Sequence, residues 1–194
     1  MDISSFSQKY TEDLQQLLKT FDHVAFKKIV DRILAAYMEE RCIFTMGNGG
    51  SATTASHLVC DLNKGCCLDL DKKFKVLCLS DNVATLMAIS NDLSYEDIFV
   101  EPLKNFFQPG DVVLGISGSG NSSNVLRAMD WANLHGGHTI GLSGYSGGKL
   151  ANMVETSLLI PIHDMQKVED MHAIVAHMLM QAIYVYLHPA GIAS

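Results

Sequence analysis

The sequence predicts an α/β fold in which a doubly wound, five-stranded parallel sheet is covered by helices on both faces. Short apolar runs alternate with segments whose apolar residues recur at helical spacing from residue 43 to residue 187. Loops rich in glycine and serine follow two of these apolar runs. Short buried strands that are separated by helices form parallel sheets, so the alternation indicates three layers.

The first part of the chain, residues 6–37, is predicted to form two helices. The apolar residues at helical spacing are Leu14, Leu17, Leu18 and Phe21 in the first helix, and Phe26, Ile29, Val30, Ile33 and Leu34 in the second. The second apolar face is broad, and we therefore expect that helix to pack on two sides.

Strands and helices are then expected to alternate. The expected strands are 43–46, 76–79, 112–116, 138–142 and 156–161. The expected helices are 52–63, 83–90, 95–107, 123–135 and 167–187, with a short helix after Ser146-Gly147-Gly148. Strands that are joined through helices run parallel.

Length and composition limit the classes of function. The 194 residues suit one domain, and a hydrophobic content of 48% with 18% charged residues disfavours disorder. The net charge of −7 disfavours binding to nucleic acid or to anionic membranes. The five cysteines include no CxxC pair, so free thiols are expected. Met1–Thr11 lacks the apolar segment of a signal peptide, and we expect a cytoplasmic protein.

Two loops are predicted to bind an anion. Gly47-Asn48-Gly49-Gly50-Ser51 lies between an expected strand and an expected helix, where free N–H groups and the helix dipole favour negative charge. A second loop, residues 117–124, follows the expected strand at 112–116. Ligands of such sheets bind at the carboxyl ends of the strands, so both loops are expected to hold one phosphorylated small molecule. Neither loop has the spacing of a dinucleotide or nucleoside triphosphate motif.

Histidines and carboxylates on two helices form the candidate chemical groups. His57 and Asp61 are four residues apart and share a helix face. In the last helix, Glu169 and His177 are eight residues apart, roughly 12 Å along a continuous helix. They can meet at one ion only if Glu169 precedes the regular helix, or if the two residues serve different subunits.

Five blocks of sequence resemble the sugar isomerase (SIS) domain family, and within it the phosphoheptose (sedoheptulose 7-phosphate) isomerases. The blocks are GNGGSATTASHLVCDL, LSDNVATLMAISND, GDVVLGISGSGNSSNVLRAM, TIGLSGYSGGKLANM and VEDMHAIVAHML, which span about residues 43–179. The resemblance implies a single domain over residues 1–194 with a flavodoxin-like core at 41–188. It also implies a helical assembly segment at 1–40 and a homotetramer with active sites between subunits.

The same resemblance implies roles for individual residues. The implied substrate-binding residues are Asn48, Gly49, Gly50, Ser51, Ser117, Gly118, Ser119, Ser122 and Gln166. The implied catalytic residues are Asp61, Glu169 and His177, and the implied ligands of zinc or another divalent metal are His57, Asp61, Glu169 and His177. The chain departs from the family at three positions: Asp61 replaces a glutamate, Glu169 replaces a glutamine, and Gly65 stands where an arginine is expected.

Two classes of function stay open at this point. The first is an aldose–ketose isomerase that converts sedoheptulose 7-phosphate to D-glycero-D-manno-heptose 7-phosphate, in which Asp61 or Glu169 moves a proton between C1 and C2. The second is a protein without catalysis: an adaptor like the family branch that binds the bacterial replication initiator protein, or a regulator that senses a sugar phosphate. The departures from the family at Asp61 and Glu169 keep the second class open.

Overall fold

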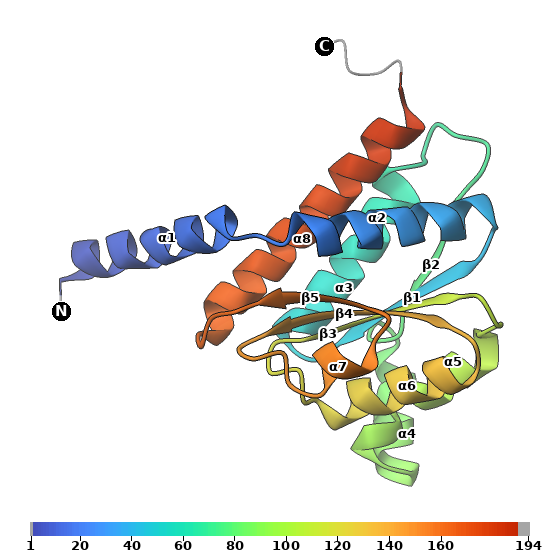
Figure 1. Cartoon of the computed structure of the whole chain (residues 1–194). Coiled ribbons are helices and arrows are strands. Elements are labelled where there is room, and N and C mark those ends of the chain that lie inside the picture. Colours follow the sequence, from blue (N-terminus) through green and yellow to red (C-terminus); the bar gives the residue numbers. More distant parts are fainter. Residues whose placement is uncertain (1, 190–194) are drawn as a thin grey trace.

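The computed structural model describes residues 2–189 and contains one five-stranded parallel sheet (Figure 1). The strands are β1 (Cys42–Gly47), β2 (Lys75–Cys78), β3 (Val112–Ser117), β4 (His138–Gly144) and β5 (Thr156–Ile160). Their order is β2-β1-β3-β4-β5, which is the flavodoxin-like doubly wound order. The predicted fold class is therefore confirmed. Met1 and residues 190–194 of the predicted domain lie outside the described residues.

The helices cover both faces of the sheet. They are α1 (Ile3–Lys19), α2 (His23–Met38), α3 (Gly50–Cys60), α4 (Val83–Asp92), α5 (Val100–Phe106), α6 (Ser123–Leu134), α7 (Leu150–Met153) and α8 (Met165–Leu187). A π-helical turn, Asp61–Gly65, continues α3, and a 3-10 turn, Tyr95–Asp97, precedes α5. None of the helices in residues 2–189 has the length and apolar character that crossing a membrane requires.

Alternation along the strands divides the core into two layers. Ile43 of β1 packs with α2, α3 and α8, whereas its neighbour Phe44 packs with α5 and α6 on the opposite face. In β3, Leu114 packs on the face covered by α2, α3 and α8, whereas Val113 packs on the face covered by α5 and α6. This period of two is what the pleat of a strand requires, and it lets the central strands be apolar on both faces.

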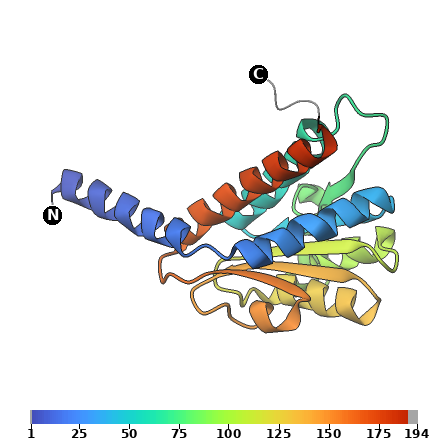
Figure 2. The same ribbon diagram turned by 45° about the horizontal axis from the view of Figure 1, so that its top comes forward.

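Helix α1 projects away from the sheet and packs against α8 (Figures 1 and 2). Two polar contacts hold it there: the Tyr10 hydroxyl donates to Asp170 at 2.6 Å, and Lys167 Nζ lies 3.0 Å from Asp13. Leu17 is the one buried residue of α1. A large apolar part of this helix consequently faces solvent in a single chain.

The predicted helix over 95–107 is wrong, because the structure divides it into the 3-10 turn and α5. Asp97 fixes the turn: its carboxylate accepts from the Ser94 hydroxyl at 2.6 Å and pairs with Arg127 Nε at 3.2 Å. Pro102 fits the first turn of α5, where its missing N–H would have no helical partner, but it would break a helix that began at residue 95.

Candidate functional site

The first loop joins β1 to α3 through three glycines. Gly49 has a φ of +54°, and a β-carbon on Gly47 would lie 2.7 Å from the backbone of Ser51. Ser80, which follows β2, holds the end of β1: its hydroxyl donates to the Gly47 carbonyl at 2.9 Å and accepts from the Gly47 N–H at 3.3 Å. The first turn of α3 has no side-chain cap. The Ala52 N–H donates to the Gly49 carbonyl at 3.0 Å, whereas the N–H groups of Gly50 and Ser51 have no partner among the described residues and can bind a ligand.

The second loop joins β3 to α6 in the same way. The hydroxyls of Ser117 and Ser122 share a hydrogen bond of 2.9 Å, and Ser122 is the N-cap residue of α6 but makes no side-chain cap. Gly118 lies against Met165 of α8, with no space for a β-carbon. Both loops thus present hydroxyls and free helix N-terminal N–H groups.

The two loops line one cavity of about 250 Å³, here called the cradle. Its lining residues are Asn48, Gly49, Gly50, Ser51, Ile116, Ser117, Gly118, Ser119, Ser122, Met165 and Glu169. None of these residues is a lysine or an arginine, so an anion there depends on hydroxyl and backbone donors. Eight of the nine predicted substrate-binding residues line the cradle; Gln166, in the first turn of α8, is exposed and does not.

A second group of residues lies two turns further along α3 and α8. His57 Nε2 is 3.5 Å from Asp61 Oδ1, and the rings of His57 and His177 meet edge to face at 4.9 Å between centroids. One potential ligand atom from each of the three residues lies within 4.8 Å of the others. The imidazoles are exposed, whereas Asp61 is half-buried.

The donors of this group, here called the triad, suit a divalent cation. Two imidazole nitrogens and one carboxylate are a set that zinc accepts. In addition, Asp61 Oδ2 is buried without a hydrogen-bond partner among the described residues. A buried carboxylate oxygen without a partner is unfavourable, and a bound cation would compensate it.

Glu169 lies in the cradle and not with the triad. Its carboxylate lies so close to Gly50 that a β-carbon on that glycine would overlap it. Because α8 begins at Met165, Glu169 lies within the regular helix. The alternative in which Glu169 precedes that helix is therefore wrong, and about 12 Å of helix separates it from His177.

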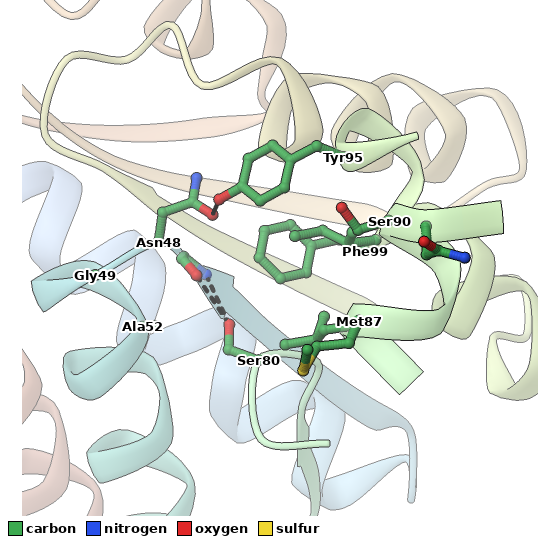
Figure 3. Close-up of a pocket in the computed structure, with 12 residues that line it drawn as sticks. Asn48, Gly49, Ala52, Ser80, Met87, Ser90, Tyr95 and Phe99 are labelled. Atoms are coloured by element: carbon green, nitrogen blue, oxygen red, sulfur yellow. Dashed lines mark hydrogen bonds between the residues drawn. The ribbon is translucent and has the colours of Figure 1, made fainter. Parts of the chain in front are cut away.

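A larger cavity of about 540 Å³ adjoins the first loop (Figure 3). The Tyr95 hydroxyl donates to Asn48 Oδ1 at 2.9 Å at its rim, and Met87 and Phe99 supply apolar walls. Sequence reasoning missed Tyr95 and Ser80 as parts of this region. Ser80 comes shortly after a predicted strand, and this position could have indicated that it lies beside the first loop. Nothing in the sequence predicts the contact between Tyr95 and Asn48.

His172, the remaining histidine of α8, is part of the core. It is 1% exposed, and Nε2 lies 3.3 Å from the Ser143 carbonyl oxygen. Burial lowers its pKa to about 4, so the ring is neutral at physiological pH. It faces neither the cradle nor the triad in the contacts described.

Comparisons with known proteins agree with this geometry. Residues 6–144 match the SIS domain family. A probable phosphoheptose isomerase of Thermoplasma acidophilum is 33% identical over 177 residues, which cover 91% of this chain and 97% of the relative. A phosphoheptose isomerase of Helicobacter pylori (strain P12) is 33% identical over 91% of this chain and 87% of its own length.

Solved structures show the same architecture. A phosphoheptose isomerase from Neisseria gonorrhoeae superposes with a TM-score of 0.85 at 26% identity, covering 93% of this chain and 96% of the other. A phosphoheptose isomerase from Francisella tularensis, with a TM-score of 0.86 at 23% identity over 93% of this chain and 95% of its own, supports the fold. The chain belongs to the SIS domain family, and curated relatives that match nearly its whole length are phosphoheptose isomerases.

Proposed function

We propose that this protein is an aldose–ketose isomerase that interconverts sedoheptulose 7-phosphate and D-glycero-D-manno-heptose 7-phosphate. The observation that carries the proposal is the cradle: the uncapped N-termini of α3 and α6 open into one cavity that is lined by serine hydroxyls. A phosphate monoester matches this set of donors. The names of the relatives supply the heptose as the sugar.

The cradle would bind and orient the substrate. The Ser119 hydroxyl would donate to the phosphate oxygens, together with the free N–H groups of both loops. Because the hydroxyls of Ser117 and Ser122 share a hydrogen bond, one of the two has a proton left to donate to the phosphate. Fixing the phosphate at one end of a seven-carbon chain places C1 and C2 at a defined distance from it, which raises the probability of proton transfer.

A carboxylate would then move the proton. It removes a proton from C1 of the open-chain ketose and returns it to C2, while one proton leaves the oxygen on C1 and another is added to the oxygen on C2. Asp61, which belongs to the triad, is one candidate for this base. Glu169 lies beside the phosphate position of its own chain, so it would act as the base only on a substrate that another subunit holds. His177 would exchange the proton on oxygen or hold the metal.

The triad of His57, Asp61 and His177 would hold zinc or another divalent cation. Such a cation supplies a positive charge that stabilises developing negative charge on oxygen. Asp61 is one methylene shorter than the glutamate of the family. Because Asp61 begins a π-helical turn, the backbone of that turn determines the position of its carboxylate.

We further propose that the working enzyme is a homotetramer with each active site between subunits. Within one chain, about 12 Å of α8 separates Glu169 from His177, so Glu169 does not reach the triad of its own chain. Glu169 of one subunit would complete the metal site of another. The exposed apolar residues of α1, Ile3 at 79% and Phe6 at 52%, suit an assembly role for residues 1–40.

The test is an assay of the purified chain with sedoheptulose 7-phosphate for the aldose product, with its metal content measured on the same sample. We expect turnover, and we expect His177→Ala to abolish it while the oligomeric mass in light scattering stays unchanged. A wild-type chain that binds the sugar phosphate without converting it would instead support a sensor or an adaptor.

A further inference from the structure

The carboxamides of Asn48 and Asn124 join the first loop to helix α6. Asn48 Nδ2 donates to Asn124 Oδ1 at 2.9 Å, and Asn124 Nδ2 donates to Asn48 Oδ1 at 2.9 Å. Asn48 directly follows β1, and Asn124 is the second residue of α6, which follows β3. The reciprocal pair therefore connects the two neighbouring strand ends whose loops form the cradle.

Neighbouring donors fix the orientation of both carboxamides. The backbone N–H of Val125 lies 2.9 Å from Asn124 Oδ1, and because an N–H only donates, the atom it contacts is the oxygen. The Tyr95 hydroxyl donates to Asn48 Oδ1 (Figure 3). Asn124 is 1% exposed, so removal of its side chain would leave buried polar groups without partners.

Helix α6 also holds the segment that carries Tyr95. Arg127, one turn after Asn124, places Nε 3.2 Å from Oδ1 of the buried Asp97 in the 3-10 turn. Asn48 is thus held by α6 directly through Asn124 and indirectly through Tyr95. Two independent contacts on one side chain indicate that its position is specified by the fold.

We propose that Asn124 is a positioning residue for the cradle, which fixes the first loop through Asn48 at the spacing from the second loop that a phosphate group requires. This inference rests on the proposed sugar-phosphate function. Asn48 Oδ1 already accepts two hydrogen bonds within the protein, so the Asn48 side chain holds the first loop in position and does not bind the ligand through this oxygen. The first loop then contacts the ligand mainly through the backbone N–H groups that follow Asn48.

Asn124→Asp tests this role because the two side chains have the same shape. The introduced carboxylate has no N–H to donate to Asn48 Oδ1, and it repels that oxygen. The hydrogen bond from residue 124 to Asn48 Oδ1 is therefore lost, while the bonds that Asn48 Nδ2 and the Val125 N–H donate to residue 124 keep an acceptor. The first loop should therefore be held less firmly in the variant than in wild type.

The first measurement is hydrogen exchange of the Gly47 and Ala52 amides in the full chain without ligand, as the ratio of variant to wild type. These two amides donate within the fold, Gly47 to the Ser80 hydroxyl and Ala52 to the Gly49 carbonyl, so their exchange reports how firmly the loop is held. For Asn124→Asp we expect a ratio of about tenfold at neutral pH.

The control is Asn133→Asp, a change of the same kind on the same helix. The Asn133 side chain donates to the Met153 carbonyl at 2.7 Å and contacts neither loop, so its ratio should stay at one. An Asn124→Asp ratio of one overturns the proposal. If that variant does not fold, the uncharged Asn124→Ala must show the same rise of about tenfold.

The second measurement is the affinity of sedoheptulose 7-phosphate by calorimetry. We expect Asn124→Asp to bind about tenfold more weakly than wild type, whereas Asn133→Asp should bind equally well. Equal affinity of Asn124→Asp and wild type contradicts the positioning role. A wild type that neither binds nor converts the sugar contradicts the proposed function, while the exchange measurement still decides the role of Asn124.

Discussion

The rings of His57 and His177 meet edge to face although they belong to different helices, α3 and α8. Two turns earlier, Gly50 and Glu169 of the same helices are in contact. The helices therefore run side by side in the same direction, with a candidate anion site at their N-terminal ends and a candidate cation site further along. This single packing relationship fixes the separation of the two sites.

His57→Ala should remove the bound metal. The substitution deletes one imidazole of a three-residue ligand set, and affinity for a divalent cation depends on ligand number. We expect the purified wild type to carry about one metal ion per chain and the variant to carry far less by elemental analysis. The control is His163→Ala, an exposed histidine outside the triad. Equal metal content in His57→Ala and wild type would contradict the metal assignment.

Asp61→Asn should lower the activity of the enzyme without lowering its stability. The neutral amide loses the carboxylate that the reaction or the metal needs, and we expect turnover to fall by about 10²- to 10⁴-fold. In the presence of a chelator the melting temperature should not fall, because Asp61 Oδ2 is buried without a partner among the described residues. Asp61→Glu, which keeps the charge, should retain more activity than Asp61→Asn. A variant as active as wild type would exclude a role for this carboxylate.

Ser122→Ala should weaken phosphate binding. The substitution removes a hydroxyl that lines the cradle and that shares a hydrogen bond with Ser117. We expect the KM for sedoheptulose 7-phosphate to rise about tenfold, measured by steady-state kinetics. Ser146→Ala, in an exposed position outside the cradle, is the matched control. An unchanged KM in Ser122→Ala would place the phosphate elsewhere.

The sequence predicted the strands and both loops well because each depends on local pattern. The run Val112 to Ile116 is apolar on both faces, and a strand with helices on both sides requires this. The contact of His57 with Asp61 was also predictable, since four residues are one helical turn.

The remaining features depend on contacts between distant segments. Pro102 was a local signal against a continuous helix over 95–107, but the pairing of Asp97 with Arg127 on another helix and the contact of Tyr95 with Asn48 have no local signal. Spacing showed that Glu169 and His177 lie far apart on one helix, but not that Gly50 would lie beside Glu169. Which helices pack together is a tertiary property that spacing within one helix does not contain.

The buried His172 should make the protein sensitive to acid. Burial lowers its pKa from 6.5 to about 4, against a smaller opposing effect of the hydrogen bond with Ser143. Below pH 6.5 the unfolded chain binds a proton at this histidine that the folded chain does not, so stability falls as the pH decreases from 6.5 towards 4. The loss from this one group is roughly 3 kcal/mol at most.

His172→Leu removes the titrating group and should therefore make the stability of the protein less dependent on pH between pH 6.5 and pH 4. We expect the melting temperature of wild type to fall more steeply than that of the variant between pH 6.5 and pH 4, whatever their difference at neutral pH. His163→Leu, which changes an exposed histidine, should leave the wild-type slope unchanged. Equal slopes for His172→Leu and wild type would mean that the imidazole is protonated inside the fold, with Nδ1, which has no partner among the described residues, bonded to water.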